Sequence, residues 1–301
     1  MTAEGTVAVP LSTSMSKAAG EAKRRLSSPW ASLVAVLLGL LWTIPTFGLA
    51  LSSVRPERQI KTSGWWTFFT HPSLTLDNYR AVFSPDSGVD LGKNLTNSFI
   101  ITIPSVVIPL ALASIAAYAF AWIEFKGRNA LFVAVFALQI VPIQVTLIPL
   151  LTIFNKTHLT DTYWTVWLSH STFALPLAIF LLHNFMKEIP RELIEAARMD
   201  GAGHVAIFFR VLMPLLTPAL AAFGIFQFLW VWNDLLVALT FVSTPDLAPL
   251  TVGIANLSGT RGTAYHLLTA GAFVSILVPM TVFLAMQRFF VRGLLAGGLK
   301  G

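Results

Sequence analysis

The stretch "KEIPRELIEAARMDGAGHVAIFFRVLMP", Lys187–Pro214, interrupts a chain that is otherwise strongly apolar. It carries eight charged residues, four of each sign, although only 11% of the 301 residues are charged and 55% are hydrophobic. Pro190 precedes an amphipathic run, and Gly201 and Gly203 follow it. This pattern predicts a helix, a glycine turn and a second helix at a membrane surface. Such an element is suited to docking into a groove on a soluble partner.

Outward from this stretch, the chain consists largely of apolar runs. A soluble domain carries about 25% charged residues, so the expected solvent for most of this chain is lipid. Runs of about 20 apolar residues are long enough to cross a bilayer. The composition therefore predicts an all-α membrane protein with six transmembrane helices, in which internal prolines mark kinks. The expected spans are Trp30–Leu51, Asn97–Trp122, Ala130–Phe154, Thr162–Phe185, Leu215–Phe241 and Leu267–Phe290, the third and fourth being the least sharply bounded.

The lysines and arginines predict the orientation of these spans. With six spans both termini lie on one side, and thirteen of the 20 basic residues fall on that side. Cytoplasmic loops carry the excess of Lys and Arg, so both termini and Lys187–Pro214 are expected to be cytoplasmic. Residues 1–29 are expected to form a mobile cytoplasmic tail, and residues 30–301 a transmembrane domain.

Several kinds of chemistry are not expected in this chain. It has no Cys, which excludes disulfides, thiolate metal sites and a cysteine nucleophile. The six histidines show no metal-ligand spacing, so no metal site is predicted. The phosphate-binding pattern G-x-x-x-x-G-K-[ST] is absent, so the chain supplies no ATP site. We expect no catalytic residue and no bound cofactor.

The stretch Lys187–Pro214 resembles the coupling loop of ABC importer permeases. The residues Glu195-Ala196-Ala197, three further residues, Gly201, nine residues and "VLMP" ending at Pro214 match the family's E-A-A, G, I-x-L-P spacing. Val211 stands for Ile and Met213 for Leu. The strings "LTLDNYRAVF", "NSFIITIP", "FQFLWVWNDLLVAL" and "RFFVRGLLAGGLKG" are similar to the maltose-type carbohydrate permeases, and the last two are most similar to alpha-glucoside permeases.

This resemblance implies a bacterial inner-membrane permease of the type I ABC importer fold. It implies a second, different permease subunit, two ATPase subunits that bind ATP and Mg, and an extracytoplasmic sugar-binding protein. The transported solute would be an oligosaccharide or alpha-glucoside such as maltose, trehalose or sucrose. The loop would transmit ATPase closure to the spans, which would alternate between inward-open and outward-open states. The ATPase-coupling residues would be Glu195, Ala196, Ala197, Asp200, Gly201 and Pro214.

Two further sets of residues are candidates for binding. Polar side chains within spans tend to face a bundle interior or a pathway. They mark a possible sugar pathway at Gln139, Gln144, Gln227, Asn233 and Asp234, and Trp230 beside the last pair could stack on a sugar ring. Asn233 and Asp234 could instead brace one helix against another. The segment before the last span resembles the loop that reaches into the binding protein, at Asn256, Ser258, Gly259 and Gly262, although a plain solvated connector is equally compatible.

Two rival functions remain open on the sequence. A secondary transporter or channel would work without an ATPase and would leave Lys187–Pro214 without a partner. An ABC permease for a solute other than a sugar would retain the coupling loop.

Overall fold

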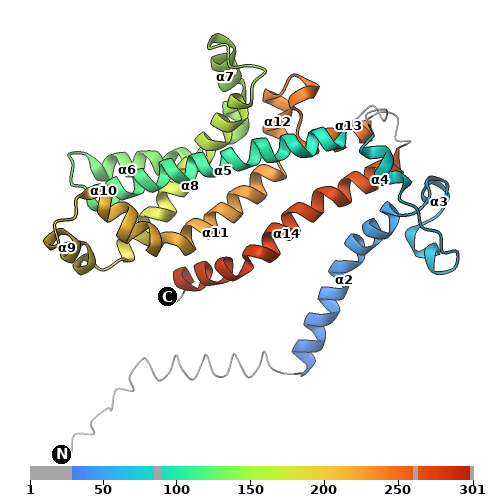
Figure 1. Ribbon diagram of the computed structural model, residues 1–301, viewed down its shortest axis with the longest axis horizontal. Helices are drawn as coiled ribbons and strands as arrows, with labels where there is room; N and C mark the ends of the chain where they lie inside the picture. The colour runs from blue at the N-terminus through green and yellow to red at the C-terminus, as the bar shows by residue number, and fades with distance from the viewer. Residues whose placement is uncertain (1–28, 85–89, 260–263, 299–301) are drawn as a thin grey trace, which may run out of the picture.

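The computed structural model describes residues 29–84, 90–259 and 264–298, and this part of the chain is helical with no strand. Figure 1 shows the helices as one elongated bundle with α2 running away from it. Residues 1–28, the predicted tail, lie outside the described residues. The elements are α2 Pro29–Ser53, α3 Glu57–Thr62, η1 Trp65–Phe69, α4 Asp77–Val82, α5 Leu91–Trp122, α6 Arg128–Ala137, η3 Leu138–Ile140, α7 Ile143–Lys156, α8 Tyr163–Glu188, α9 Arg191–Met199, α10 His204–Ala206, η4 Ile207–Leu212, α11 Met213–Trp232, α12 Leu236–Phe241, η5 Pro245–Leu247, α13 Leu250–Gly259 and α14 Tyr265–Gly298.

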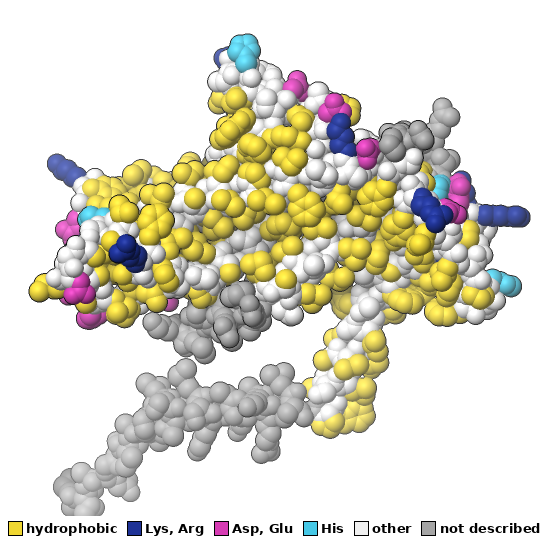
Figure 2. Space-filling view, viewed as in Figure 1, with side chains coloured by type: hydrophobic (Ala, Val, Ile, Leu, Met, Phe, Trp, Pro, Cys, Tyr) yellow, Lys and Arg dark blue, Asp and Glu magenta, His cyan; other side chains and the backbone are white. Residues whose placement is uncertain are grey.

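Five helices are long and apolar enough to cross a membrane, when α10, η4 and α11 are counted as one continuous helix. They are α2, α5, α8, α10–α11 and α14, and the bent pair α6–η3 and α7 makes a sixth if it counts as one span. The prediction of an all-α protein with membrane-crossing helices is therefore confirmed. Figure 2 agrees with it, because hydrophobic side chains cover the middle of the visible face and charged ones gather towards its ends.

The expected third span, Ala130–Phe154, is not continuous. The helix breaks at Val141 and Pro142, and the two pieces meet at 102°. Proline has no N–H to donate and pushes the preceding residue into extended backbone, and Val141 has φ −71° and ψ 120°. The sequence predicted a kink here, and the structure shows a break.

The expected fifth span, Leu215–Phe241, is also wrong at its end. Helix α11 stops at Trp232, and Asn233 and Asp234 lie in a turn before the short α12. The Asp234 carboxylate accepts the backbone N–H groups of Val237 and Ala238, which are unpaired donors at the start of α12. The available signal was the polar pair Asn233–Asp234, because Asn and Asp side chains favour helix starts over helix interiors.

The core of the bundle lies between α5 and α8, which run side by side. Small residues line this contact, Ala113 and Ala117 from α5 and Ala174 and Ala178 from α8, and all four are buried. Small side chains let membrane helices approach closely, so that van der Waals packing holds them together. Helix α11 packs on both of them and on α14.

Helix α2 contacts the rest of the chain mainly at its C-terminal half, through α14 and η1. Gly48 is buried under the Trp65 indole, where an added Cβ would lie 2.7 Å from Nε1. The following turn is fixed by Arg55, which is 1% exposed and donates to the hydroxyls of Ser63 and Thr67. The first turns of α2 remain exposed.

Candidate functional site

Helix α9 presents two different faces. Ile194 is 2% exposed and belongs to the main core cluster, so it anchors α9 on the bundle. Leu193 and Met199 point away and are 46% and 88% exposed. Of the predicted coupling residues, Glu195, Ala196 and Asp200 are exposed on this helix and Ala197 is half-buried. Helix α9 therefore lies on the bundle as an amphipathic helix with an uncovered outer face.

The end of α9 is a Schellman turn. The Gly201 N–H donates to the Arg198 carbonyl at 2.9 Å, and the Ala202 N–H donates to the Ala197 carbonyl at 2.9 Å. Gly201 has φ +81°, the left-handed conformation that a side chain disfavours. An added Cβ would meet nothing within 4 Å, so the requirement for glycine here is conformational.

Beyond this turn the chain returns to the membrane through a π-helical segment. His204 begins α10, and its Nδ1 lies 2.7 Å from the hydroxyl of Tyr118 on α5. The Tyr118 ring also makes edge contacts with His204 and Phe208. Residues Ile207–Leu212 form the π-helix, and such segments are frequent at functional sites. Pro214 follows as the second residue of α11, directly after the π-helix, where its ring supplies no N–H to the helical hydrogen bonds.

The opposite end of the bundle, which carries η5, α13 and the start of α5, is fixed by polar side chains of α5. Asn94 Nδ2 donates to the Ala248 carbonyl at 2.7 Å, and Asn97 Nδ2 donates to the carbonyls of Asp246 and Ala248 at 2.8 and 3.0 Å. The Leu250 N–H donates to Ser98 Oγ at 2.8 Å. The name asparagine clamp is used below for this set of contacts. It comprises Asn94, Asn97, Ser98 and the backbone of residues 246–250, to which they are bonded.

The segment before the last span, which was predicted to be a loop, contains the helix α13. Asn256 is exposed on this helix, and Ser258 and Gly259 form its last turn. Gly262 lies outside the described residues. Gly253 is buried and allows α13 to approach Asn94 closely, because an added Cβ there would lie 2.6 Å from Oδ1.

Two of the six pathway candidates come together at the break in the third span. Gln139 and Gln144 line one cavity of about 430 Å³, together with Thr146, Thr172 and Phe173. Both glutamines are exposed in this chain. Uncovered amides are costly in hydrocarbon, so this face is expected to line a polar space or to meet another subunit.

The other pathway candidates lie apart from that cavity. Gln227 is 1% exposed and its Nε2 donates to the Ser105 carbonyl, which braces α11 against α5. Asn233 donates to the Leu229 carbonyl of its own helix. Asp234 lies 3.7 Å from Nε2 of the buried His170, whose ring makes an edge contact with Trp230. The bracing interpretation, which was made for Asn233 and Asp234, therefore has an inter-helix contact for Asp234. Gln227, for which it was not made, also joins two helices.

The model of one protein family, the inner membrane component of binding-protein-dependent transport systems, matches residues 109–295. The chain belongs to this family. It is 47% identical over 300 residues to the osmoprotective compounds uptake permease protein GgtD of Synechocystis sp., covering 95% of this chain and 100% of that protein. It is 38% identical to the alpha-glucoside transport system permease protein AglG of Rhizobium meliloti, covering 92% and 99%.

A solved structure supports the fold of this family. A bacterial ABC transporter involved in the import of the acidic polysaccharide alginate contains a chain that superposes with a TM-score of 0.72, at 20% identity, over 87% of this chain and 96% of that one. The ABC permease fold is thus confirmed, as is a multi-pass inner-membrane component that is not itself an enzyme. Within the described residues no group of three or more His, Cys, Asp or Glu side chains could hold a metal ion.

Sequence reasoning missed the residues that fix the two ends of the bundle. Asn97 lies in a string quoted for its family resemblance, but nothing in that string shows that its amide binds a carbonyl 149 residues away. His204 was counted as one of six scattered histidines, and its place at a helix start after Gly203 was the available signal.

Proposed function

We propose that this chain is one permease subunit of an ATP-driven sugar importer and that α9 is its coupling helix. The observation that carries the proposal is the uncovered outer face of α9, set between the spans α8 and α11 and ended by the Gly201 turn. An amphipathic helix of this kind fits a groove on a second protein. The ATP and Mg would be bound by that protein.

The proposed assembly contains a second permease subunit, two ATPase subunits and an extracytoplasmic binding protein. Both termini and α9 would face the cytoplasm, and the asparagine clamp would face the binding protein. Closure of the ATPase dimer would move α9 and shift the bundle between inward-open and outward-open states. The predicted loop contact with the binding protein would then fall on the end of α13, near Asn256.

The proposed substrate is an oligosaccharide or an alpha-glucoside such as maltose, trehalose or sucrose. The alpha-glucoside permease among the relatives supports this class. The cavity at the helix break offers two amides, two hydroxyls and the Phe173 ring, which are groups that bind sugar hydroxyls and sugar faces. Gln139 and Gln144 are the residues that we assign to the pathway first. Broken membrane helices commonly form such sites.

Cross-linking tests the coupling role directly. The chain has no Cys, so Ala196→Cys introduces a single reactive thiol on the outer face of α9. In membranes that contain the whole transporter we expect a cross-link from position 196 to the ATPase. Thr96→Cys, exposed near the clamp at the other end, is the matched control and should give none. A secondary transporter or channel would show no ATPase cross-link from either position.

A second candidate solute is an osmoprotective compound, because the relative GgtD is named for such compounds. Uptake of labelled trehalose in competition with maltose, sucrose, glucose, glycerol phosphate and glycine betaine separates the two. Competition by the disaccharides alone supports the sugar assignment. Competition by betaine without the disaccharides supports a non-sugar osmoprotectant, and the carbohydrate assignment then fails.

A further inference from the structure

A polar pocket lies between α9 and the turn that joins α5 to α6. Its volume is about 130 Å³, which is room for about four water molecules at about 30 Å³ each. Arg191, Ile194, Glu195 and Arg198 line it from one face of α9, since positions spaced by three and four residues share a helix face. The opposite wall is formed by Ala121, Trp122, Glu124 and Arg128.

Within the part of the chain that the structure describes, the charged groups in this pocket form no ion pairs. Among the described residues, no carboxylate lies within the 4.0 Å ion-pair limit of Arg128, Arg191 or Arg198. The Trp122 Nε1–H is buried and finds no acceptor among the described residues. Glu124 also takes part in no ion pair of the described chain. The pocket thus offers cationic donors and carboxylate acceptors at once.

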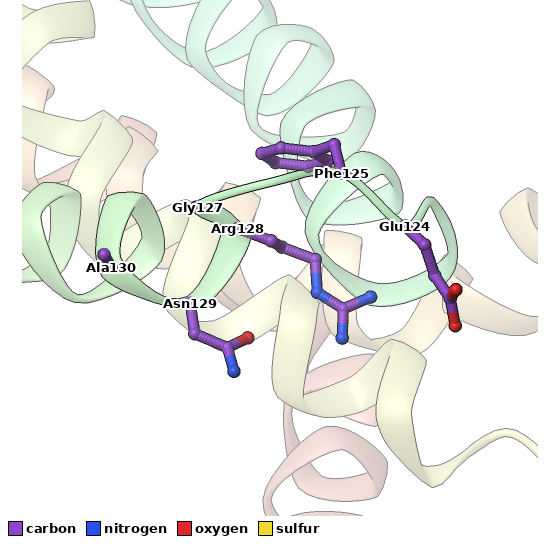
Figure 3. A pocket seen from close by; sticks show the side chains of 6 residues that line it. All are labelled: Glu124, Phe125, Gly127, Arg128, Asn129 and Ala130. Atoms are coloured by element: carbon purple, nitrogen blue, oxygen red, sulfur yellow. The ribbon is translucent and has the colours of Figure 1, made fainter.

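A second cavity continues from this pocket along the turn. It has a volume of about 360 Å³ and shares Glu124 and Arg128 with the first. Figure 3 shows that the side chains of Glu124 and Arg128 extend to the same side of the turn, while the Phe125 ring lies on the other. Arg128 Nη1 donates to the Ile123 carbonyl at 3.3 Å, which fixes the direction of the side chain. The other N–H groups of the guanidinium remain available to a ligand.

The depth of the pocket matches the headgroup layer of a bilayer. Trp122 is the last residue of the span α5, and tryptophans at span ends sit at the interface. Phe125 and Leu131 beside it are 40% and 51% exposed, as expected for side chains in contact with lipid. Basic pockets between spans at this depth bind lipid headgroups.

We infer that this pocket binds the phosphoethanolamine headgroup of a membrane phospholipid. The three guanidinium groups and the Trp122 N–H match the phosphate, and the carboxylates of Glu124 and Glu195 match the ammonium group. The smaller pocket has room for a phosphate group and is too small for a nucleotide. A headgroup without an ammonium would leave both carboxylates unmatched, and a trimethylated ammonium has no hydrogen to donate to them.

A lipid in this place would connect two parts that are otherwise joined loosely. One wall of the pocket belongs to α9 and the other to the bundle, so an occupied pocket holds α9 in one position. Dependence of transport on lipid composition would follow from this, and that consequence rests on the coupling role proposed above. The binding itself does not depend on it.

The test measures lipid binding to the intact transporter in nanodiscs of phosphatidylcholine that contain phosphatidylethanolamine or phosphatidylglycerol. Native mass spectrometry reports the lipid retained by each variant. Three variants in one turn are compared: Arg128→Gln, Glu124→Gln and the control Lys126→Gln, which removes an exposed charge outside the pocket. Arg128→Lys, which keeps the positive charge, shows that any loss does not come from misfolding.

We expect phosphatidylethanolamine to be retained ahead of the other two lipids. Arg128→Gln should weaken retention of every lipid about five-fold, equivalent to about 1 kcal/mol for one basic group. Glu124→Gln should abolish only the preference for phosphatidylethanolamine, and Lys126→Gln should match the parent. Equal retention of all lipids, preference for phosphatidylglycerol, or an equal loss in Lys126→Gln overturns the inference. An Ala196→Cys cross-link in the same preparation reports on the coupling role separately.

Discussion

The two ends of the bundle are held in different ways. At one end the asparagine clamp joins the backbone of residues 246–250 to α5 by four hydrogen bonds. Tyr163 donates in addition to Asn97 Oδ1 at 2.7 Å. At the other end, within the described residues, one side-chain hydrogen bond joins the segment 187–214 to another span, and it connects Tyr118 with His204.

This difference indicates where the molecule is built to move. A segment held by several bonds to backbone carbonyls keeps one geometry, because each broken bond leaves a buried polar group unpaired. Helix α9, which is anchored by Ile194 and makes no side-chain hydrogen bond to a span within the described residues, can shift as a unit at small cost. We therefore expect substitutions in the clamp to reduce stability, and substitutions around α9 to reduce transport.

The largest effect is expected from Asn97→Ala in the clamp. This change removes the side-chain amide that donates to the Asp246 carbonyl. It also removes the acceptor of the Tyr163 hydroxyl. Leaving such groups unpaired should lower the free energy of unfolding by about 2 to 3 kcal/mol. Thermal unfolding of the detergent-purified transporter measures it. Thr96→Ala, whose exposed hydroxyl bonds only its own helix, is the control, and equal melting of the two variants would contradict the clamp.

Gly253→Ala should have the next largest effect. The new Cβ would lie 2.6 Å from Asn94 Oδ1 and 2.9 Å from its Cγ, so α13 or Asn94 must shift. Overpacking of this kind costs about 1 to 3 kcal/mol. Thermal unfolding measures the loss, and Gly39→Ala on α2, where a Cβ meets nothing within 4 Å, should melt no lower than the parent. If Gly253→Ala melts at the same temperature as the parent, the packing of α13 against Asn94 is not as tight as the contact distances indicate, and the prediction is wrong.

At the α9 end, Gly201→Ala should disturb the Schellman turn. A side chain in the left-handed conformation costs about 1 to 2 kcal/mol, so α9 would end differently. We expect uptake to fall while insertion into the membrane and melting of the bundle change little. Gly203→Ala is a matched control, since that glycine has φ −77° and open space around its Cβ position. Equal uptake by both variants would exclude a role for the turn geometry.

Tyr118→Phe should give the smallest effect on stability. It removes only the hydroxyl, worth about 1 kcal/mol, and keeps the ring contact with Phe208. If this bond transmits the motion of α9 to α5, the number of ATP molecules hydrolysed per solute imported should rise. His204→Asn, which retains an acceptor near Nδ1, should restore part of the coupling that His204→Leu loses. An unchanged ratio in Tyr118→Phe would show that packing alone carries the motion.

The sequence predicted more of the coupling element than of the pathway. The spacing from Glu195 to Pro214 depends on contacts within one short segment, and the structure places a helix, a glycine turn and a return helix there. The pathway candidates other than Trp230 were chosen because they are polar residues in apolar runs. That criterion did not separate Gln139 and Gln144, which share a cavity, from Gln227, which bonds the Ser105 carbonyl inside the bundle.

By itself the sequence determined that the chain is helical, that it lies in a membrane and that it belongs to the ABC permeases, because hydrophobic run length and motif spacing are local properties. Only the tertiary structure decided that α13 is held against α5 and that Tyr118 meets His204. These features depend on pairs of residues that are far apart in the chain and meet only once the helices pack, such as Asn94 and Ala248, which are 154 positions apart.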